Sequence, residues 1–263
     1  MTLLAITLVG IAFLTSCIVS ARLFALAGRT GNPLARLAAI ANSAIFCFGF
    51  PLAAVSRAPA LDGTYEGSLI FTISMMALSI GMAALYRFPQ LVFRPSRAWA
   101  VVLRNVASTA GAIAGAGCAV GVTMARRPTE MLEATRPWAI GLMVTIALPF
   151  LWNGIESVLL YLRMRRRRRL GLAADPLVGH RLLLWACSSW YTVLTVAGVI
   201  LIRLDGTPIR SPLPLSMIAV CTLVCLGSSG IAFMMPRAYR VHVVGIPDRA
   251  PGSDADRTTG ETT

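Results

Sequence analysis

Seven apolar stretches of about twenty residues occupy almost the whole chain, and they constrain its fold more than any other feature. They cover residues 3–23, 37–55, 68–86, 105–124, 138–162, 182–202 and 213–235. A helix of about 20 apolar residues is long enough to cross the roughly 30 Å hydrocarbon core of a bilayer. We therefore predict an all-α, polytopic membrane protein, with one transmembrane domain of seven transmembrane helices over residues 1–236.

The gaps between these stretches differ sharply in positive charge. All 24 basic residues are arginine. Eighteen of them lie in the first, third and fifth gaps or after the last stretch, and the other six lie in the second, fourth and sixth gaps. Positive residues concentrate on the cytoplasmic side of membrane proteins. This pattern predicts an N-terminus outside the cell and a C-terminus in the cytoplasm.

The composition changes after Pro236. Residues 237–263 are rich in Asp, Thr, Gly, Pro and Arg, and they contain few large apolar side chains. Such a segment cannot bury enough apolar surface to offset the entropy of ordering. We expect a disordered cytoplasmic tail over 237–263.

The absence of lysine excludes several classes of protein. A retinal Schiff base, a Walker-type phosphate loop and a pyridoxal site all need a lysine amine. His180 and His242 lie outside the apolar stretches, so two axial histidines for a transmembrane haem are lacking. The segment Gly227–Gly230 matches the GxSG pattern of rhomboid-type proteases, but no later helix supplies a histidine base. We therefore expect no enzymatic activity and no cofactor.

The six cysteines all fall inside apolar stretches, and none belongs to a CxxC pair. Disulfides need an oxidising compartment, and metal sites need clustered ligands. We therefore interpret these cysteines as small apolar core residues, and we expect no metal site.

Polar side chains recur on the inward faces of several predicted helices. Glu156 is the single acidic residue inside a predicted span, where a charge costs roughly 2.5–3.5 kcal/mol at the helix centre. One interpretation is a polar vestibule that faces the cytoplasm, with Glu156 as its charged centre and Arg104 or Arg22 as the partner of Glu156. The other is ordinary hydrogen bonding between helices, worth about 0.6 kcal/mol per contact. The candidate vestibule residues are Glu156, Asn153, Ser157, Arg104, Asn105, Ser188 and Thr192.

A dense arginine run follows the fifth apolar stretch. Near an anionic cytoplasmic leaflet, each arginine contributes about 1 kcal/mol of attraction. The run is therefore a candidate contact for anionic inner-leaflet lipids, or alternatively an orientation signal alone. No aromatic platform accompanies it, so we do not expect nucleic-acid binding. Its members are Arg163, Arg165, Arg166, Arg167, Arg168 and Arg169.

The fourth apolar stretch carries two pairs of glycines at four-residue spacing. These are Gly111 with Gly115 and Gly117 with Gly121. Small residues at this spacing let two helix backbones approach closely in lipid. The partner is either another helix of the same chain or a second copy, which would form a homo-oligomer.

Four short motifs resemble a group of actinobacterial integral membrane proteins that are labelled as transporters. They are Arg29-Thr30-Gly31-Asn32-Pro33, Phe50-Pro51-Leu52-Ala53-Ala54, Tyr86-Arg87-Phe88-Pro89 and Met235-Pro236-Arg237. The resemblance covers most of residues 1–237 and implies a multi-pass membrane fold. Members of that group generally carry a further cytosolic domain, where this chain has a short tail.

Together, these features predict a non-enzymatic, multi-pass protein of the bacterial plasma membrane. We expect a sensory, regulatory or accessory component that associates with a membrane protein partner. The alternative is a small secondary transporter that uses a cytoplasm-facing vestibule around Glu156, because transporters place their binding groups among interrupted helices.

The orientation is testable at Met164, inside the arginine run. In a variant without native cysteines, Met164→Cys should react with a membrane-impermeant maleimide from the cytoplasmic side only, because the positive-inside rule places this gap there. Labelling of intact cells and of inverted vesicles measures the difference. Reaction in intact cells would overturn the predicted orientation.

Overall fold

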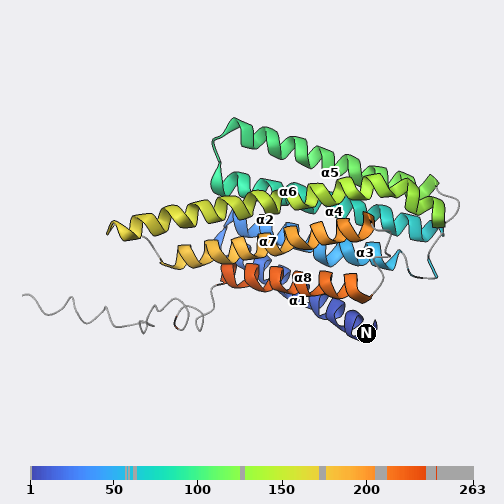
Figure 1. The fold of residues 1–263 in the computed structure, drawn as a ribbon, viewed down its shortest axis with the longest axis horizontal. Coiled ribbons are helices and arrows are strands. Elements are labelled where there is room, and N and C mark those ends of the chain that lie inside the picture. Colours follow the sequence, from blue (N-terminus) through green and yellow to red (C-terminus); the bar gives the residue numbers. More distant parts are fainter. Residues whose placement is uncertain are drawn as a thin grey trace, which may run out of the picture.

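The chain forms a bundle of antiparallel helices in the computed structural model, which describes residues 2–56, 58, 60–61, 64–124, 128–171, 176–204, 212–234 and 241 (Figure 1). No strand occurs among these residues, which confirms the predicted all-α class. The elements are α1 (Thr2–Thr30), α2 (Pro33–Asn42), the π-helix η1 (Ser43–Gly49), α3 (Phe50–Val55), α4 (Tyr65–Phe93), α5 (Ala98–Met124), α6 (Pro128–Arg169), α7 (Pro176–Leu204) and α8 (Pro212–Met234).

The elements α2, η1 and α3 follow one another without a break, so together they correspond to the second predicted stretch. Six helical segments in the described part of the chain are long and apolar enough to cross a membrane. These six are Gly10–Thr30, Pro33–Val55, Tyr65–Phe93, Ala98–Met124, Glu133–Arg169 and Pro176–Ile202. The seventh predicted stretch, 213–235, corresponds to α8, whose described apolar part, Ala219–Phe233, is shorter. The architecture is that of a multi-pass membrane protein.

The first turn shows how the sequence sets the helix boundaries. Gly31 has a φ of 63°, a left-handed conformation that glycine adopts readily after a helix. Asn32 then caps α2, because its side chain accepts a hydrogen bond of 2.9 Å from the backbone N–H of Leu34. Pro33 occupies the first helical position, where a missing N–H costs nothing.

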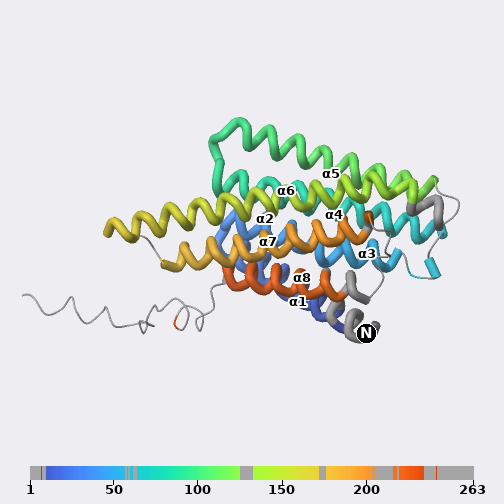
Figure 2. The backbone as a smooth tube through the Cα atoms, viewed as in Figure 1, coloured from blue at the N-terminus to red at the C-terminus, as the bar shows by residue number. Residues whose placement is uncertain are grey.

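Several helices extend beyond the apolar stretches that predicted them. α4 continues through Pro89 to Phe93, and α6 has 42 residues, which at 1.5 Å per residue make about 63 Å. Arginine is a good helix former, so the helix does not stop where the apolar residues stop. The end of α6 projects beyond the other helices (Figure 2). The predicted tail, 237–263, lies outside the described residues except for position 241.

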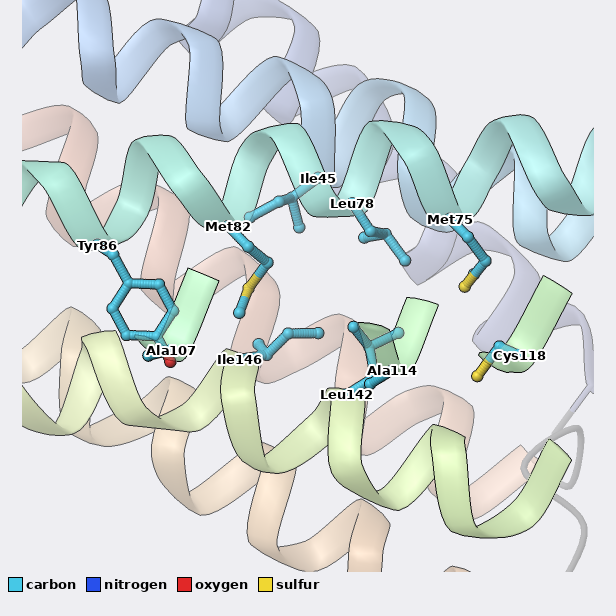
Figure 3. Close-up of a cluster of buried hydrophobic side chains, with 10 residues drawn as sticks. All are labelled: Ile45, Met75, Leu78, Met82, Tyr86, Ala107, Ala114, Cys118, Leu142 and Ile146. Atoms are coloured by element: carbon cyan, nitrogen blue, oxygen red, sulfur yellow. The ribbon is translucent and has the colours of Figure 1, made fainter. Parts of the chain in front are cut away.

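The packing places α5 on one side of the bundle, against α4 and α6. α7 packs between α6 and α8, and α1 packs against α2 and α8. A core of buried side chains joins η1, α4, α5 and α6 (Figure 3). At one edge of this core, the Tyr86 hydroxyl donates a hydrogen bond of 2.6 Å to the Thr145 carbonyl.

The four glycines of α5 face other helices of the same chain. A Cβ atom at Gly115 would lie 3.1 Å from a hydroxyl on α4, and one at Gly121 would lie 3.1 Å from a methyl group on α6. Close approach of α5 to both neighbours therefore depends on these small residues. The side chains that face Gly111, Gly115, Gly117 and Gly121 are, in that order, Thr145, Ser79, Trp138 and Thr135.

The outward faces of the helices carry large apolar side chains. Met76 on α4 is 62% exposed, Val106 on α5 is 62% exposed and Leu194 on α7 is 65% exposed. Soluble monomers rarely expose apolar surface on this scale. These faces suit a hydrocarbon environment.

Candidate functional site

A cavity of about 90 Å³ lies between α1, α2, η1, α4, α6, α7 and α8. On α6, its wall includes Pro149 and Asn153, which lie near the middle of the predicted span 138–162. Apolar side chains make up most of its surface, and a few polar groups interrupt them. Concave sites of this kind are the default candidates for ligand binding. The polar side chains of the wall are Asn42, Asn153, Ser188, Ser189 and Ser229, with the thiol of Cys225.

The predicted vestibule residues divide into two groups. Asn153 and Ser188 line the cavity, and the Thr192 hydroxyl donates a hydrogen bond of 3.1 Å to Cys225 Sγ in the cavity wall. The other four do not line this cavity, and they belong to the part of the helices nearer the arginine-rich gaps. They are Arg104, Asn105, Glu156 and Ser157. The sequence therefore identified two polar residues of the cavity wall, whereas Glu156, the predicted centre of the vestibule, lies outside this wall.

Most polar groups of the cavity wall bond to each other across helices. Asn153 Nδ2 on α6 donates a hydrogen bond of 2.6 Å to Ser189 Oγ on α7. Ser188 Oγ on α7 lies 2.7 Å from Ser229 Oγ on α8. These contacts are the interhelical hydrogen bonds that the second interpretation of the polar stripe predicted.

One polar atom of the wall lacks a hydrogen bond. Asn153 is 9% exposed, and its Oδ1 atom is buried without a partner. Leaving a buried acceptor unpaired costs about 1–3 kcal/mol, so such an atom calls for a donor from outside the protein. Among the described residues, the other buried side-chain atoms without a partner are Trp152 Nε1 and Ser157 Oγ.

Three aromatic rings from three helices line the cavity near the arginine-rich ends of those helices. The Phe88 and Trp185 rings are stacked with centroids 4.3 Å apart, and the Trp185 and Phe233 centroids are 5.0 Å apart. All three side chains line the cavity. We call Phe88, Trp185 and Phe233 the aromatic cluster.

The helices around the cavity are irregular at three places. In η1, the Phe50 N–H bonds to the carbonyl of Ile45, five residues earlier. Pro51 follows Phe50 directly and has no backbone N–H. In a regular α-helix its ring would clash with the carbonyl four residues earlier. The wider turn of the π-helix avoids this clash. Pro89 in α4 and Pro149 in α6 each remove one backbone hydrogen bond inside a helix that continues through them, and both line the cavity. π-Segments in helices occur frequently at functional sites.

Glu156 forms a bidentate ion pair with Arg94, the residue that follows α4. Arg94 Nε donates to Glu156 Oε1 at 2.7 Å, and Arg94 Nη2 donates to Glu156 Oε2 at 3.1 Å. This hydrogen bonding, together with the negative charge, raises the pKa of Arg94. The expectation of Arg104 or Arg22 as the partner was wrong, because nothing in the sequence distinguishes the arginines at this end of the bundle.

Arg104 instead belongs to a separate polar group beside the ion pair. Its Nη2 donates a hydrogen bond of 2.8 Å to Asn105 Oδ1, and its Nη1 donates one of 3.3 Å to Gln90 Oε1. Gln90 is 3% exposed, and its Nε2 donates to the Pro95 carbonyl at 3.3 Å. Gln90 was not among the predicted site residues, although a polar residue directly after Pro89 was a signal for such a role.

The arginine run lies on the last turns of α6. All six arginines are exposed, so they surround the helix end. Leu170 and Gly171 close the helix by backbone hydrogen bonds to carbonyls in the run, and Gly171 has a φ of 71°. The run is therefore a helical extension of α6, which we call the arginine extension (residues 163–169).

No family model, no curated protein and no solved structure matches this chain in comparisons with known proteins.

The Arg94–Glu156 pair makes a quantitative prediction for stability. Arg94→Gln or Glu156→Gln alone should destabilise the protein, because each leaves one charge without its partner. The double variant should recover part of the loss, with a coupling free energy of about 1–3 kcal/mol. Unfolding of the four proteins in mixed micelles measures this coupling. Additive losses would show that the pair is not a stabilising contact.

Proposed function

We propose that this chain is a non-enzymatic sensory or regulatory component of the bacterial plasma membrane. In this proposal, a ligand binds in the cavity, and the effect reaches the cytoplasm through α6. A single observation supports it best: one unbroken helix carries a cavity wall, the ion pair and the arginine extension.

The path along α6 is short and direct. Asn153 lines the cavity, and Glu156 follows one turn later, where it is paired with Arg94 at the end of α4. The helix then continues without interruption to Arg169. A rigid secondary element that contacts two sites is a physical means of coupling them, provided that it has two arrangements.

The arginine extension is suited to contact a negatively charged surface. We propose that it binds the anionic headgroups of the inner leaflet, since the predicted orientation brings the end of α6 to that leaflet. A change in the tilt of α6 would then alter how many arginines reach the headgroups. A neighbouring membrane protein or a second copy of the chain would respond to that change in tilt.

This proposal predicts that filling the cavity moves the arginine extension. Spin labels at Ser96→Cys and Leu170→Cys, in a variant without native cysteines, report the distance between the α4–α5 turn and the end of α6. Ser229→Leu places a larger apolar group in the cavity and should shift this distance by about 1–2 Å or more, which is typical of helix shifts in switching proteins.

Gly227→Leu is the matched control, because Gly227 is on the same helix and no atom lies within 4 Å of its Cβ position. It should leave the distance unchanged. If Ser229→Leu is not monodisperse, Ser229→Val fills less volume and serves instead. An unchanged distance in a folded cavity-filling variant would contradict the sensory proposal.

A second candidate function is secondary transport through the cavity. It is supported by the helix irregularities, because interrupted helices at a central site are typical of transporters. The resemblance to actinobacterial membrane proteins labelled as transporters also favours it. The binding groups would then be those of the cavity wall, since Glu156 is engaged with Arg94 and lies outside that wall.

Alternating access distinguishes the two candidates through Cys225, a native thiol in the cavity wall. With the other five cysteines changed to alanine, a transporter should allow a membrane-impermeant maleimide to reach Cys225 from both sides. The sensory proposal predicts reaction from one side at most. A membrane-permeant maleimide confirms that the thiol is reactive, and a cysteine-free variant gives the background.

A further inference from the structure

We infer that the cavity binds a small, neutral molecule that carries one hydrogen-bond donor on an apolar, ring-sized body. This inference rests on the proposed function, in which the cavity is the ligand site. It adds the charge, the size and the polar group of the ligand. Each of these follows from a different property of the wall.

The charge of the ligand follows from the residues of the wall. Among the described residues, none of those that line the cavity is acidic or basic. Glu156, one turn beyond Asn153 on α6, is neutralised by Arg94. An ionised ligand would lose its hydration without gaining a counter-charge, which is very costly in an apolar interior. The ligand is therefore neutral.

The size of the ligand follows from the volume. The cavity has about 90 Å³, whereas drug-sized sites measure roughly 300–1,000 Å³. An engineered apolar cavity of about 150 Å³ binds benzene, and a water molecule occupies about 30 Å³ of liquid. The site thus suits molecules from a short alcohol to a single ring, with modest adjustment of the wall for the largest. It does not suit a lipid chain.

The polar group follows from Asn153. Its Nδ2 is already bonded to Ser189 Oγ, and its Oδ1 has no partner. A hydroxyl or amine group on the ligand would supply the missing donor once a small rotation of the amide brings Oδ1, which is buried in this structure, to the cavity surface. Ser188 and Ser229 also line the cavity, but their hydroxyl groups are hydrogen-bonded to each other. They therefore require a hydrogen bond from the ligand less than Asn153 Oδ1 does. Asn153 Oδ1 is thus the acceptor that selects for a donor.

The apolar body of the ligand would lie against the aromatic cluster. Phe88, Trp185 and Phe233 present ring surfaces from three helices to the same cavity. Aromatic groups pack favourably on such surfaces in offset or edge-to-face arrangements. A flat ring with one hydroxyl satisfies both the aromatic cluster and Asn153, and phenol is the simplest probe with these properties.

Phenol and benzene form a matched pair for the test, because they differ by one hydroxyl group. The full chain is labelled with 5-fluorotryptophan in lipid nanodiscs, and the Trp185 resonance is assigned with Trp185→Phe. We expect a saturable shift at Trp185 with both probes, and half-saturation at about fivefold lower concentration for phenol, as one net hydrogen bond predicts. Trp190 on α7 is 40% exposed and does not line the cavity, so it reports nonspecific partition.

Asn153→Leu should abolish the preference for phenol while binding of benzene persists. Asn153→Ala serves where the leucine variant does not fold, and Thr195→Ala, on α7 but outside the cavity wall, should retain the preference. Equal binding of phenol and benzene to the wild type would overturn the assignment of Asn153 and leave the proposed ligand site standing. No saturable shift with either probe would mean that the cavity holds only water, and it would overturn both this inference and the proposed ligand site.

Discussion

In hydrocarbon, every backbone N–H and C=O group must find its partner within the protein, and the rest of this structure depends on that constraint. Long helices satisfy it by themselves, which is why the described chain consists of helices and short turns. The exceptions are therefore informative. Pro51, Pro89 and Pro149 each remove a backbone donor, and all three lie in or directly beside segments that line the cavity. Of the prolines inside α4 and α6, Pro89 and Pro149 thus lie at the cavity, whereas Pro137 does not.

Polar side chains in hydrocarbon must also find hydrogen-bond partners within the protein, but fewer partners are available to them. Asn42 on α2 illustrates this, because its Nδ2 donates to the Ser16 carbonyl at 3.0 Å and to Ser20 Oγ at 2.6 Å on α1. Glu156 and Arg94 satisfy each other in the same way, although they carry full charges. Three buried atoms depart from this background of paired groups, and Asn153 Oδ1 is the one of them that belongs to the cavity wall, where a bound molecule would explain it.

The sequence predicted the helices better than it predicted the site. Apolar stretches locate spans reliably because their length is set by the bilayer, and Gly31-Asn32-Pro33 marks a turn by local chemistry. The ends of α4 and α6 were missed, since an arginine-rich segment is compatible with either a loop or a helix. The π-segment η1 gave no signal beyond Pro51. Asn153 and Ser188 were identified from their faces, but the pairing of Glu156 with Arg94 depends on how α4 and α6 pack, which no local pattern encodes.

The separation of Arg94 and Glu156 in the chain has a consequence for biosynthesis. The two residues are 62 positions apart, with all of α5 between them. At a synthesis rate of about 5–20 residues per second, Arg94 exists for roughly 3–12 seconds before Glu156 is made. During that interval α4 and α5 enter the bilayer while the guanidinium group has only water or lipid phosphate as a counterpart. When α6 follows, it packs its apolar side chains against α4 and α5, and its Glu156 also supplies the counter-charge of Arg94.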